Sequence, residues 1–190
     1  MLKSILKTSS ALFVATTIGF ASAGAAFAMD ENPMVGGAAM FADKNIVENA
    51  VNSKDHTTLV AAVKAAGLVE TLQSEGPFTV FAPTNAAFEA LPEGTVETLL
   101  KPENKDMLTK VLTAHVVAGD VKAADLIKMI EDNGGTYNFT AVSGDALSAQ
   151  LNDGNVYIID ENGNAAKVTI ADVNQSNGVI HVVNSVLVPK

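Results

Sequence analysis

The residues of this sequence best suited to acid–base or metal chemistry are its three histidines, His56, His115 and His181. Histidine exchanges protons near neutral pH and is a common metal ligand. The three are far apart in the chain, however, and the absence of Cys removes the usual zinc-binding motifs. No serine stands in a G-x-S-x-G nucleophile pattern. We therefore expect no catalytic residue, no metal site and no cofactor, and a hydrolase would have to depend on His115.

His115 has two interpretations. It falls on the apolar side of a helix predicted over residues 104–117, and the other residues of that side are Met107, Leu108, Val111 and Leu112. It is either the polar anchor of a partner or ligand site, or a core histidine that bonds to the backbone. The second interpretation predicts a neutral ring that acid would charge.

The other polar candidates have simpler interpretations. His181 is expected on the opposite face of its strand from Ile180 and Val182, as a structural or surface residue, and His56 is expected in a loop. Asp160-Glu-Asn-Gly-Asn164 has the oxygen-rich composition of a calcium loop. It lacks the spacing and the terminal Glu of an EF-hand, so a hairpin turn is favoured.

Large apolar side chains could also form a ligand site. Four of them could line a groove between helices and sheet: Phe88, Met129, Tyr137 and Phe139. An apolar cleft of that kind suits a small apolar ligand such as a carotenoid or a lipid. The same residues could instead be ordinary core, and the sequence leaves both interpretations open.

The N-terminus is predicted to be a Sec signal peptide over residues 1–28. Lys3 and Lys7 give it a positive start, residues 11–20 are apolar, and Ala26-Phe-Ala28 is a small-x-small cleavage site. The apolar stretch is shorter than the about 20 residues that cross a bilayer. We expect an exported protein, periplasmic or extracellular, without stable membrane insertion after cleavage.

Residues 29–43 are expected to be a flexible leader because they contain Pro and Gly-Gly and show no periodicity. Their methionines, Met29, Met34 and Met40, could bind Cu(I) through thioethers, but incidental methionines in a solvated tail are the simpler interpretation. Residues 44–190 are expected to be one domain, with enough length for a substantial core.

The charge balance narrows the choice of partners. The chain has 21 acidic and 12 basic residues, a formal charge of −9, and all of its basic residues are Lys. Nucleic acids need Lys or Arg to neutralise their phosphates, so no nucleic acid is expected as a partner. The lack of Cys also means that an exported form would be stabilised by its core and not by disulfides.

Helical and strand patterns divide the chain into two halves. Apolar residues at helical spacing predict helices near residues 45–50, 57–66, 68–73, 86–91, 96–100, 104–117 and 123–130. Alternating patterns predict strands at residues 78–81, 137–142, 146–151, 156–159, 166–173 and 179–188. A mostly helical first half and a β second half indicate an α+β domain. We expect the strand at 78–81 to join the later sheet next to the C-terminal strand.

Two segments resemble a known family. Phe78-Thr-Val-Phe-Ala-Pro-Thr-Asn-Ala-Ala-Phe88 and Asn177-Gly-Val-Ile-His-Val-Val-Asn-Ser-Val-Leu187 are similar, in that order, to the two defining segments of fasciclin domains. Residues 58–68 resemble the family's first long helix, and residues 112–119 its central Tyr-His segment. The motif residues carried over are Phe78, Thr79, Val80, Phe81, Ala82, Pro83, Thr84, Asn85, Phe88, Gly178, Ile180 and His181. The sequence of residues 45–72 is most similar to that of small secreted bacterial members.

The resemblance implies a single fasciclin domain, a β-wedge or sandwich of about seven strands flanked by several short helices. It also implies non-enzymatic adhesion or interaction at the cell surface, with a surface protein or polysaccharide as partner. The binding residues it suggests are His115, Asp172 and Val173. Ala114 stands where the family commonly has Tyr, and Val173 where it has Ile, so an integrin-like role is disfavoured. The alternative function is a carrier of a small apolar ligand.

Overall fold

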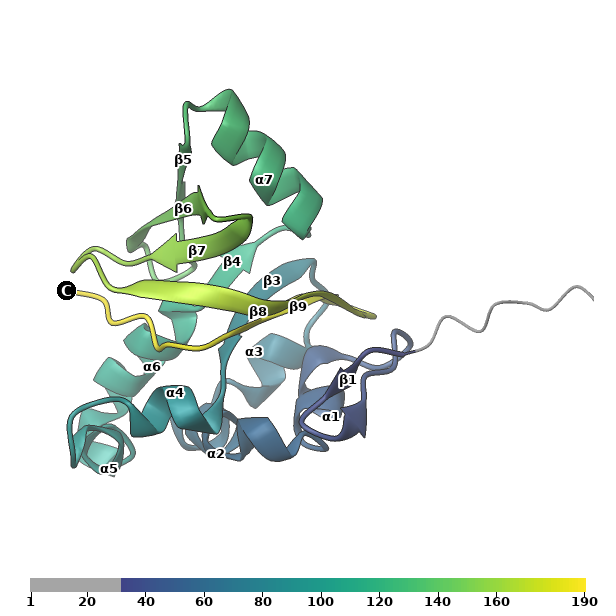
Figure 1. The fold of residues 1–190 in the computed structure, drawn as a ribbon. Helices are drawn as coiled ribbons and strands as arrows, with labels where there is room; N and C mark the ends of the chain where they lie inside the picture. Colours follow the sequence, from purple (N-terminus) through teal and green to yellow (C-terminus); the bar gives the residue numbers. More distant parts are fainter. Residues whose placement is uncertain (1–31) are drawn as a thin grey trace, which may run out of the picture. The chain divides into compact units, whose positions relative to one another are not determined.

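The computed structural model describes residues 32–190, in which seven strands form one sheet in the order β4-β3-β9-β8-β7-β6-β5 (Figure 1). The strands are β3 (Phe78–Pro83), β4 (Val116–Ala118), β5 (Thr136–Thr140), β6 (Ala146–Asn152), β7 (Asn155–Ile159), β8 (Ala165–Gln175) and β9 (Gly178–Val183). Neighbours are antiparallel except β3 and β9, which are parallel. The predicted pairing of the Phe78 strand with the C-terminal strand is confirmed.

The helices fall into two groups. The first contains α1 (Ile46–Ala50), α2 (Thr57–Ala66), α3 (Val69–Gln73), α4 (Asn85–Glu89), α5 (Thr95–Leu99) and α6 (Lys105–Ala114), with 3-10 turns at Lys54–His56 and Pro102–Asn104. These lie together below the central strands in Figure 1, whereas α7 (Ala123–Asp132) lies beside β5, β6 and β7. Within residues 32–190, no helix has the length and apolar character needed to cross a membrane. The predicted α+β class is confirmed.

Each helix group covers its own apolar core. In the first core, the first six helices pack on one side of β3 and β9. Its buried residues include Ile46, Phe88 and Ile180. The other lies between α7 and strands β5 to β8, and includes Ile130 and Ile158. Alternation along β3 and β9 places successive side chains in the two cores, so both faces of these central strands are buried.

Short-range signals set several helix boundaries. Asn45 and Glu48 form a capping box at α1, and the Thr84 hydroxyl accepts a hydrogen bond from the Ala87 N–H at α4. Gly67 ends α2 in the left-handed conformation, at φ 76°. The boundaries of these helices are therefore encoded by individual residues next to them.

The expected flexible leader is wrong for residues 32–43. There, β1 (Met34–Val35) and β2 (Ala38–Ala39) form a hairpin, and Val35 and Met40 are buried in the first core. Asn49 fixes the hairpin, since its Oδ1 accepts from the Phe41 N–H at 3.0 Å and its Nδ2 donates to the Phe41 carbonyl at 2.7 Å. The signal peptide predicted over residues 1–28, and residues 29–31, lie outside the described residues.

Two predicted elements end earlier than the pattern suggests. The helix expected over residues 104–117 stops at Ala114, because the chain then pairs with β3 as β4; Met107 is largely exposed. The strand expected over 179–188 stops at Val183.

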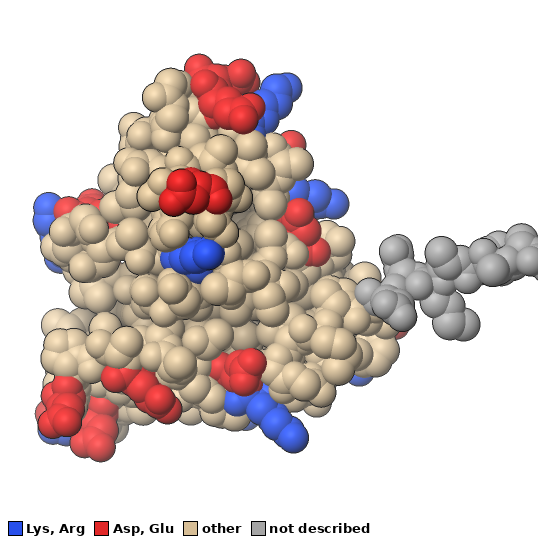
Figure 2. Space-filling model, viewed as in Figure 1, with Lys and Arg blue, Asp and Glu red and all other residues tan. Residues whose placement is uncertain are grey.

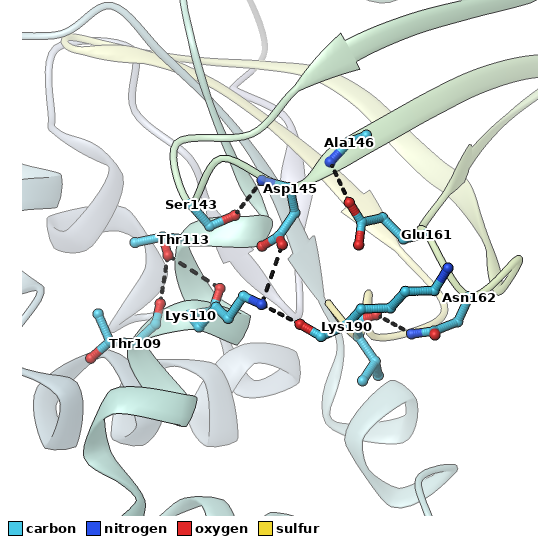
Figure 3. A network of polar contacts seen from close by, with 10 residues as sticks. Thr109, Lys110, Thr113, Ser143, Asp145, Ala146, Glu161, Asn162 and Lys190 are labelled. Atoms are coloured by element: carbon cyan, nitrogen blue, oxygen red, sulfur yellow. Dashed lines mark hydrogen bonds and ion pairs between the residues drawn. The ribbon is translucent and has the colours of Figure 1, made fainter.

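The Asn184 N–H still donates to the Lys167 carbonyl of β8 at 3.1 Å, and the C-terminal segment after Asn184 is held mainly by side chains. Asp160 accepts from the Val188 N–H at 2.9 Å, and Asn162 donates to the Val188 carbonyl at 2.7 Å. Lys110 of α6 bonds to the Lys190 carbonyl and lies 3.5 Å from the Asp145 carboxylate (Figure 3). These contacts attach the end of the chain to α6 and to the turn between β7 and β8.

Candidate interaction surface

The first family motif occupies the centre of the sheet and the start of α4. Thr79 is buried, and its hydroxyl donates to the Gly119 carbonyl at 2.7 Å and accepts from the Val121 N–H at 2.9 Å. The Asn85 side chain accepts from the Thr58 N–H at 3.0 Å, at the start of α2. The motif's polar residues thus join neighbouring segments of the fold.

Gly178 of the second motif is required by a close approach of two strands. A Cβ atom there would lie 1.9 Å from the Phe78 carbonyl oxygen, and its φ is 155°. Only glycine allows β3 and β9 to begin their parallel pairing at this distance.

His115 is a core residue with 2% of its surface exposed. Its Nδ1 donates to the Val111 carbonyl at 2.8 Å, and its Nε2 accepts from the Leu187 N–H at 2.9 Å. This arrangement requires the neutral ring, because Nε2 must remain an acceptor. Burial lowers the pKa of His115 to about 4, against the opposing effects of the Val111 carbonyl and Asp160.

His181 is completely buried and is not a surface residue. Its Nε2 donates to the Val121 carbonyl at 2.8 Å, its Nδ1 accepts from the Asp172 N–H at 3.3 Å, and its ring stacks on Phe81. It is buried because the central strand β9 is covered on both faces. Desolvation lowers the pKa of His181, although the Val121 carbonyl and two aspartates oppose the shift.

His56 is also buried and belongs to a 3-10 turn, where an open loop was expected. Its Nδ1 lies 2.9 Å from the Ser53 hydroxyl. Burial lowers its pKa too, partly offset by the Ala82 carbonyl and by Asp55. His115 and His181 therefore connect separate segments of the fold, whereas the side-chain hydrogen bond of His56 is local and its Nε2 has no hydrogen-bond partner among the described residues.

The predicted binding residues do not form one exposed surface. His115 and Val173 are buried, and Asp172 is half-buried. Asp172 has a positive φ of 57° at an irregularity of β8, and its Oδ1 accepts from the Ala123 N–H at 2.8 Å at the start of α7. Of the three residues, only Asp172 has a side chain that is accessible to a partner.

The Asp160 carboxylate accepts four hydrogen bonds that hold the turn between β7 and β8. Its Oδ1 accepts from the N–H groups of Asn162 and Asn164, and its Oδ2 accepts from the Asn164 amide and the Val188 N–H, each at 2.9 Å. The hairpin-turn interpretation of Asp160–Asn164 therefore fits the geometry, since these oxygens face donors.

A groove opens where the two edges of the sheet separate. It has a volume of about 290 Å³ and lies between β4 and β5, beside the start of α7. Its lining contains Thr79, Phe81, Val117, Ala118, Val121, Leu126, Tyr137, Phe139 and Thr140. We call this feature the edge groove.

The four large apolar residues expected to share a groove are divided between two places. Tyr137 and Phe139 line the edge groove, with ring centroids 5.8 Å apart. Met129 packs against the core behind it, whereas Phe88 is buried in the other core. Sequence reasoning missed Ala118, Thr140 and Val121. The sequence carries no signal for these small residues, because they become a site only when β4 and β5 meet.

A second, mostly apolar cavity lies among the first helices. Its volume is about 60 Å³, and residues of α1, α2, α3, α6 and β3 line it. Pockets for drug-sized ligands measure roughly 300–1,000 Å³. This cavity is therefore too small for such a ligand in the conformation described.

Residues 54–189 match the fasciclin domain family. The chain belongs to the fasciclin family. The matched range contains both motif segments, all three histidines and both sides of the edge groove. The predicted resemblance is thus confirmed.

Fasciclin relatives occur in bacteria and animals. Protein sll1483 of Synechocystis is 49% identical over 160 residues, 84% of this chain and 82% of that protein. Immunogenic protein MPB70 of Mycobacterium bovis is 35% identical, covering 74% and 66%. Transforming growth factor-beta-induced protein ig-h3 of Sus scrofa is 39% identical, covering 69% of this chain and 17% of its own.

The fold is also similar to that of a solved structure. A FAS1 domain pair from the insect cell adhesion molecule Fasciclin I superimposes with a TM-score of 0.67 at 18% identity. The match covers 76% of this chain and 50% of that one. At this identity the likeness supports the fold alone.

Proposed function

We propose that this fasciclin protein is an exported, non-enzymatic interaction module that acts in the periplasm or outside the cell. The family match over residues 54–189 is the observation that carries this proposal. The partner would be a surface protein or a polysaccharide. Nucleic acid is disfavoured by the formal charge of −9.

The histidine contacts support a non-enzymatic role. Nδ1 and Nε2 of His115 and His181 all have internal hydrogen-bond partners, and burial lowers the pKa of each ring. A general base needs access to a substrate proton. The residues most suited to that chemistry are instead committed to holding segments together.

Export and interaction can be tested separately. Fractionation of cells that express the full chain, or a chain lacking residues 2–28, should find only the full chain outside the cytoplasm. The purified full-length protein, labelled at an added C-terminal tag, should then bind intact cells of the source organism in a saturable way. Equal distribution of the two chains would contradict export, and unsaturable or absent binding would contradict the interaction role.

A carrier of a small apolar ligand is the second candidate, and the edge groove is the observation that favours it. Its volume of about 290 Å³ approaches the lower end of the usual range for ligand pockets. Native mass spectrometry and an absorbance scan of protein from its source would reveal a bound apolar molecule. A bare polypeptide mass would argue against the carrier.

A further inference from the structure

The two edge strands of the sheet touch at one point and separate from there. The Val142 N–H, just after β5, donates to the Val116 carbonyl of β4 at 2.7 Å. Continuing this antiparallel register by two residues on each strand would pair Ala118 with Thr140. Both residues instead line the edge groove, on opposite sides of it. The backbone hydrogen bonding between β4 and the end of β5 is therefore present at Val142 and does not continue to Thr140 and Ala118.

Backbone groups of β5 face outward from the sheet at alternate residues. The Ala141 N–H donates inward, to the Asp145 carbonyl. Adjacent residues of an antiparallel strand direct their N–H and C=O groups to opposite sides. Asn138 and Thr140 therefore direct theirs away from β6, on the same side as the Val142 N–H.

The edge of β4 has the same arrangement. The His115 carbonyl accepts from the Phe81 N–H, and the Gly119 N–H donates to the Pro77 carbonyl. Residues 115, 117 and 119 thus bond to β3, and Ala118 faces outward. Within residues 32–190, β4 and β5 are the end strands of the sheet, and neither has a second neighbouring strand.

The β5 edge lacks the usual protection against strand pairing. Natural edge strands commonly carry Lys, Pro or inward-pointing charges that prevent another chain from adding to the sheet. Thr136-Tyr-Asn-Phe-Thr140 contains no charged residue and no Pro, and Asn138 and Thr140 are exposed. The groove beside it offers the apolar rings of Tyr137 and Phe139 to an incoming side chain.

We propose that the outer edge of β5, beside the edge groove, binds an extended peptide segment of a partner protein as an added strand. This inference rests on the proposed interaction role and names its surface. The backbone of the segment would bond to Asn138 and Thr140. An apolar side chain at one of its alternate positions would enter the groove.

Charge defines the partner further. The adjacent helix α7 carries Asp125, Glu131 and Asp132 against one base, Lys128. Figure 2 shows acidic side chains at the upper end of the visible face, with a basic side chain beside them. The partner segment should therefore be basic as well as apolar. A second copy of this chain is disfavoured because each copy has a formal charge of −9.

Selection from a displayed library of random nine-residue peptides on the full-length protein tests this proposal. We expect enriched peptides to combine alternating apolar residues with Lys or Arg. Their binding should protect the amides of Asn138 and Thr140 from hydrogen exchange. Methylation of a single peptide nitrogen that faces β5 should weaken binding about tenfold, because each lost backbone hydrogen bond costs about that factor.

Two variants at one position separate backbone pairing from side-chain contact. Asn138→Pro removes an outward N–H, which an edge strand tolerates, and should weaken binding about tenfold. Asn138→Ala keeps the N–H and should bind like the parent protein. If Asn138→Pro fails to fold, the methylated peptides and the exchange pattern still decide the question.

Several outcomes would overturn the proposal. These are a library without enriched peptides, equal binding of methylated peptides, or protection confined to another surface. A concentration-dependent dimer that Asn138→Pro dissociates would assign the edge to self-association. If no peptide binds while the protein still binds cells, the edge proposal is wrong and the interaction role stands.

Discussion

Acid should destabilise the domain through His115, and the size of the effect follows from its surroundings. Burial lowers the pKa of this ring from the ordinary value of 6.5 to about 4. Each unit of pKa difference corresponds to about 1.4 kcal/mol, so the free energy of unfolding is roughly 3 kcal/mol lower in acid, where the ring is charged, than at neutral pH. Charging it would also place a second donor against the Leu187 N–H.

The sign of the pH dependence is fixed by which state binds the proton more readily. Between pH 6.5 and about 4 the unfolded chain is protonated at this histidine while the folded domain keeps it neutral. Stability is therefore fully present above pH 6.5 and falls as the pH decreases toward 4. His56 and His181, whose pKa values burial also lowers, add to the loss in the same direction.

Urea unfolding followed by circular dichroism at several pH values would measure this loss of stability in acid. His115→Gln keeps a donor and an acceptor but cannot titrate, so between pH 7 and 4 it should lose roughly 3 kcal/mol less than the parent protein. As a control, Ala124→His adds an exposed histidine to α7 and should leave the slope unchanged. If the free energy of unfolding fell by the same amount between pH 7 and 4 in the parent protein and in His115→Gln, the assignment of a neutral, buried ring would be refuted.

Three further substitutions test the packing. Phe81→Ala removes a ring that is 1% exposed and should cost about 3–5 kcal/mol; a melting shift of only a degree or two would contradict its core position. Gly178→Ala forces a Cβ against the Phe78 carbonyl and should lower the melting temperature more than Phe81→Ala does, so native-like stability would disprove the close approach. Asn49→Ala leaves the Phe41 backbone unpaired and should cost about 2 kcal/mol, with faster amide exchange in residues 33–41; unchanged exchange would show that the hairpin does not depend on Asn49.

Local patterns in the sequence predict much of this fold. Thr84 and Gly67 mark helix boundaries through their own side-chain or backbone chemistry, and the alternating strands after Gly135 appear close to where the pattern places them. These features depend on residues next to one another. The pairing of β3 with β9 is also predicted correctly, although the two strands are far apart in the sequence.

Long-range contacts account for the wrong predictions. Val116 and Val117 continue the apolar period of α6, and only pairing with β3 makes them a strand. Residues 32–43 look like a linker because Gly36-Gly37 interrupts them, yet Asn49 holds them in place. The edge groove could not be predicted for the same reason, since it forms between strands that are far apart in the sequence.

The polar contacts that hold the fold lie apart from the proposed binding edge. His115 joins α6 to the C-terminal segment, and His181 joins β9 to the loop before α7. Both are buried, so changing them alters stability whether or not a partner is present. The outward groups of Asn138 and Thr140 have no such role among residues 32–190, because β5 pairs only with β6. A loss of peptide binding at unchanged melting temperature in Asn138→Pro, and the reverse in His115→Gln, would therefore show that interaction and stability reside in different parts of the domain.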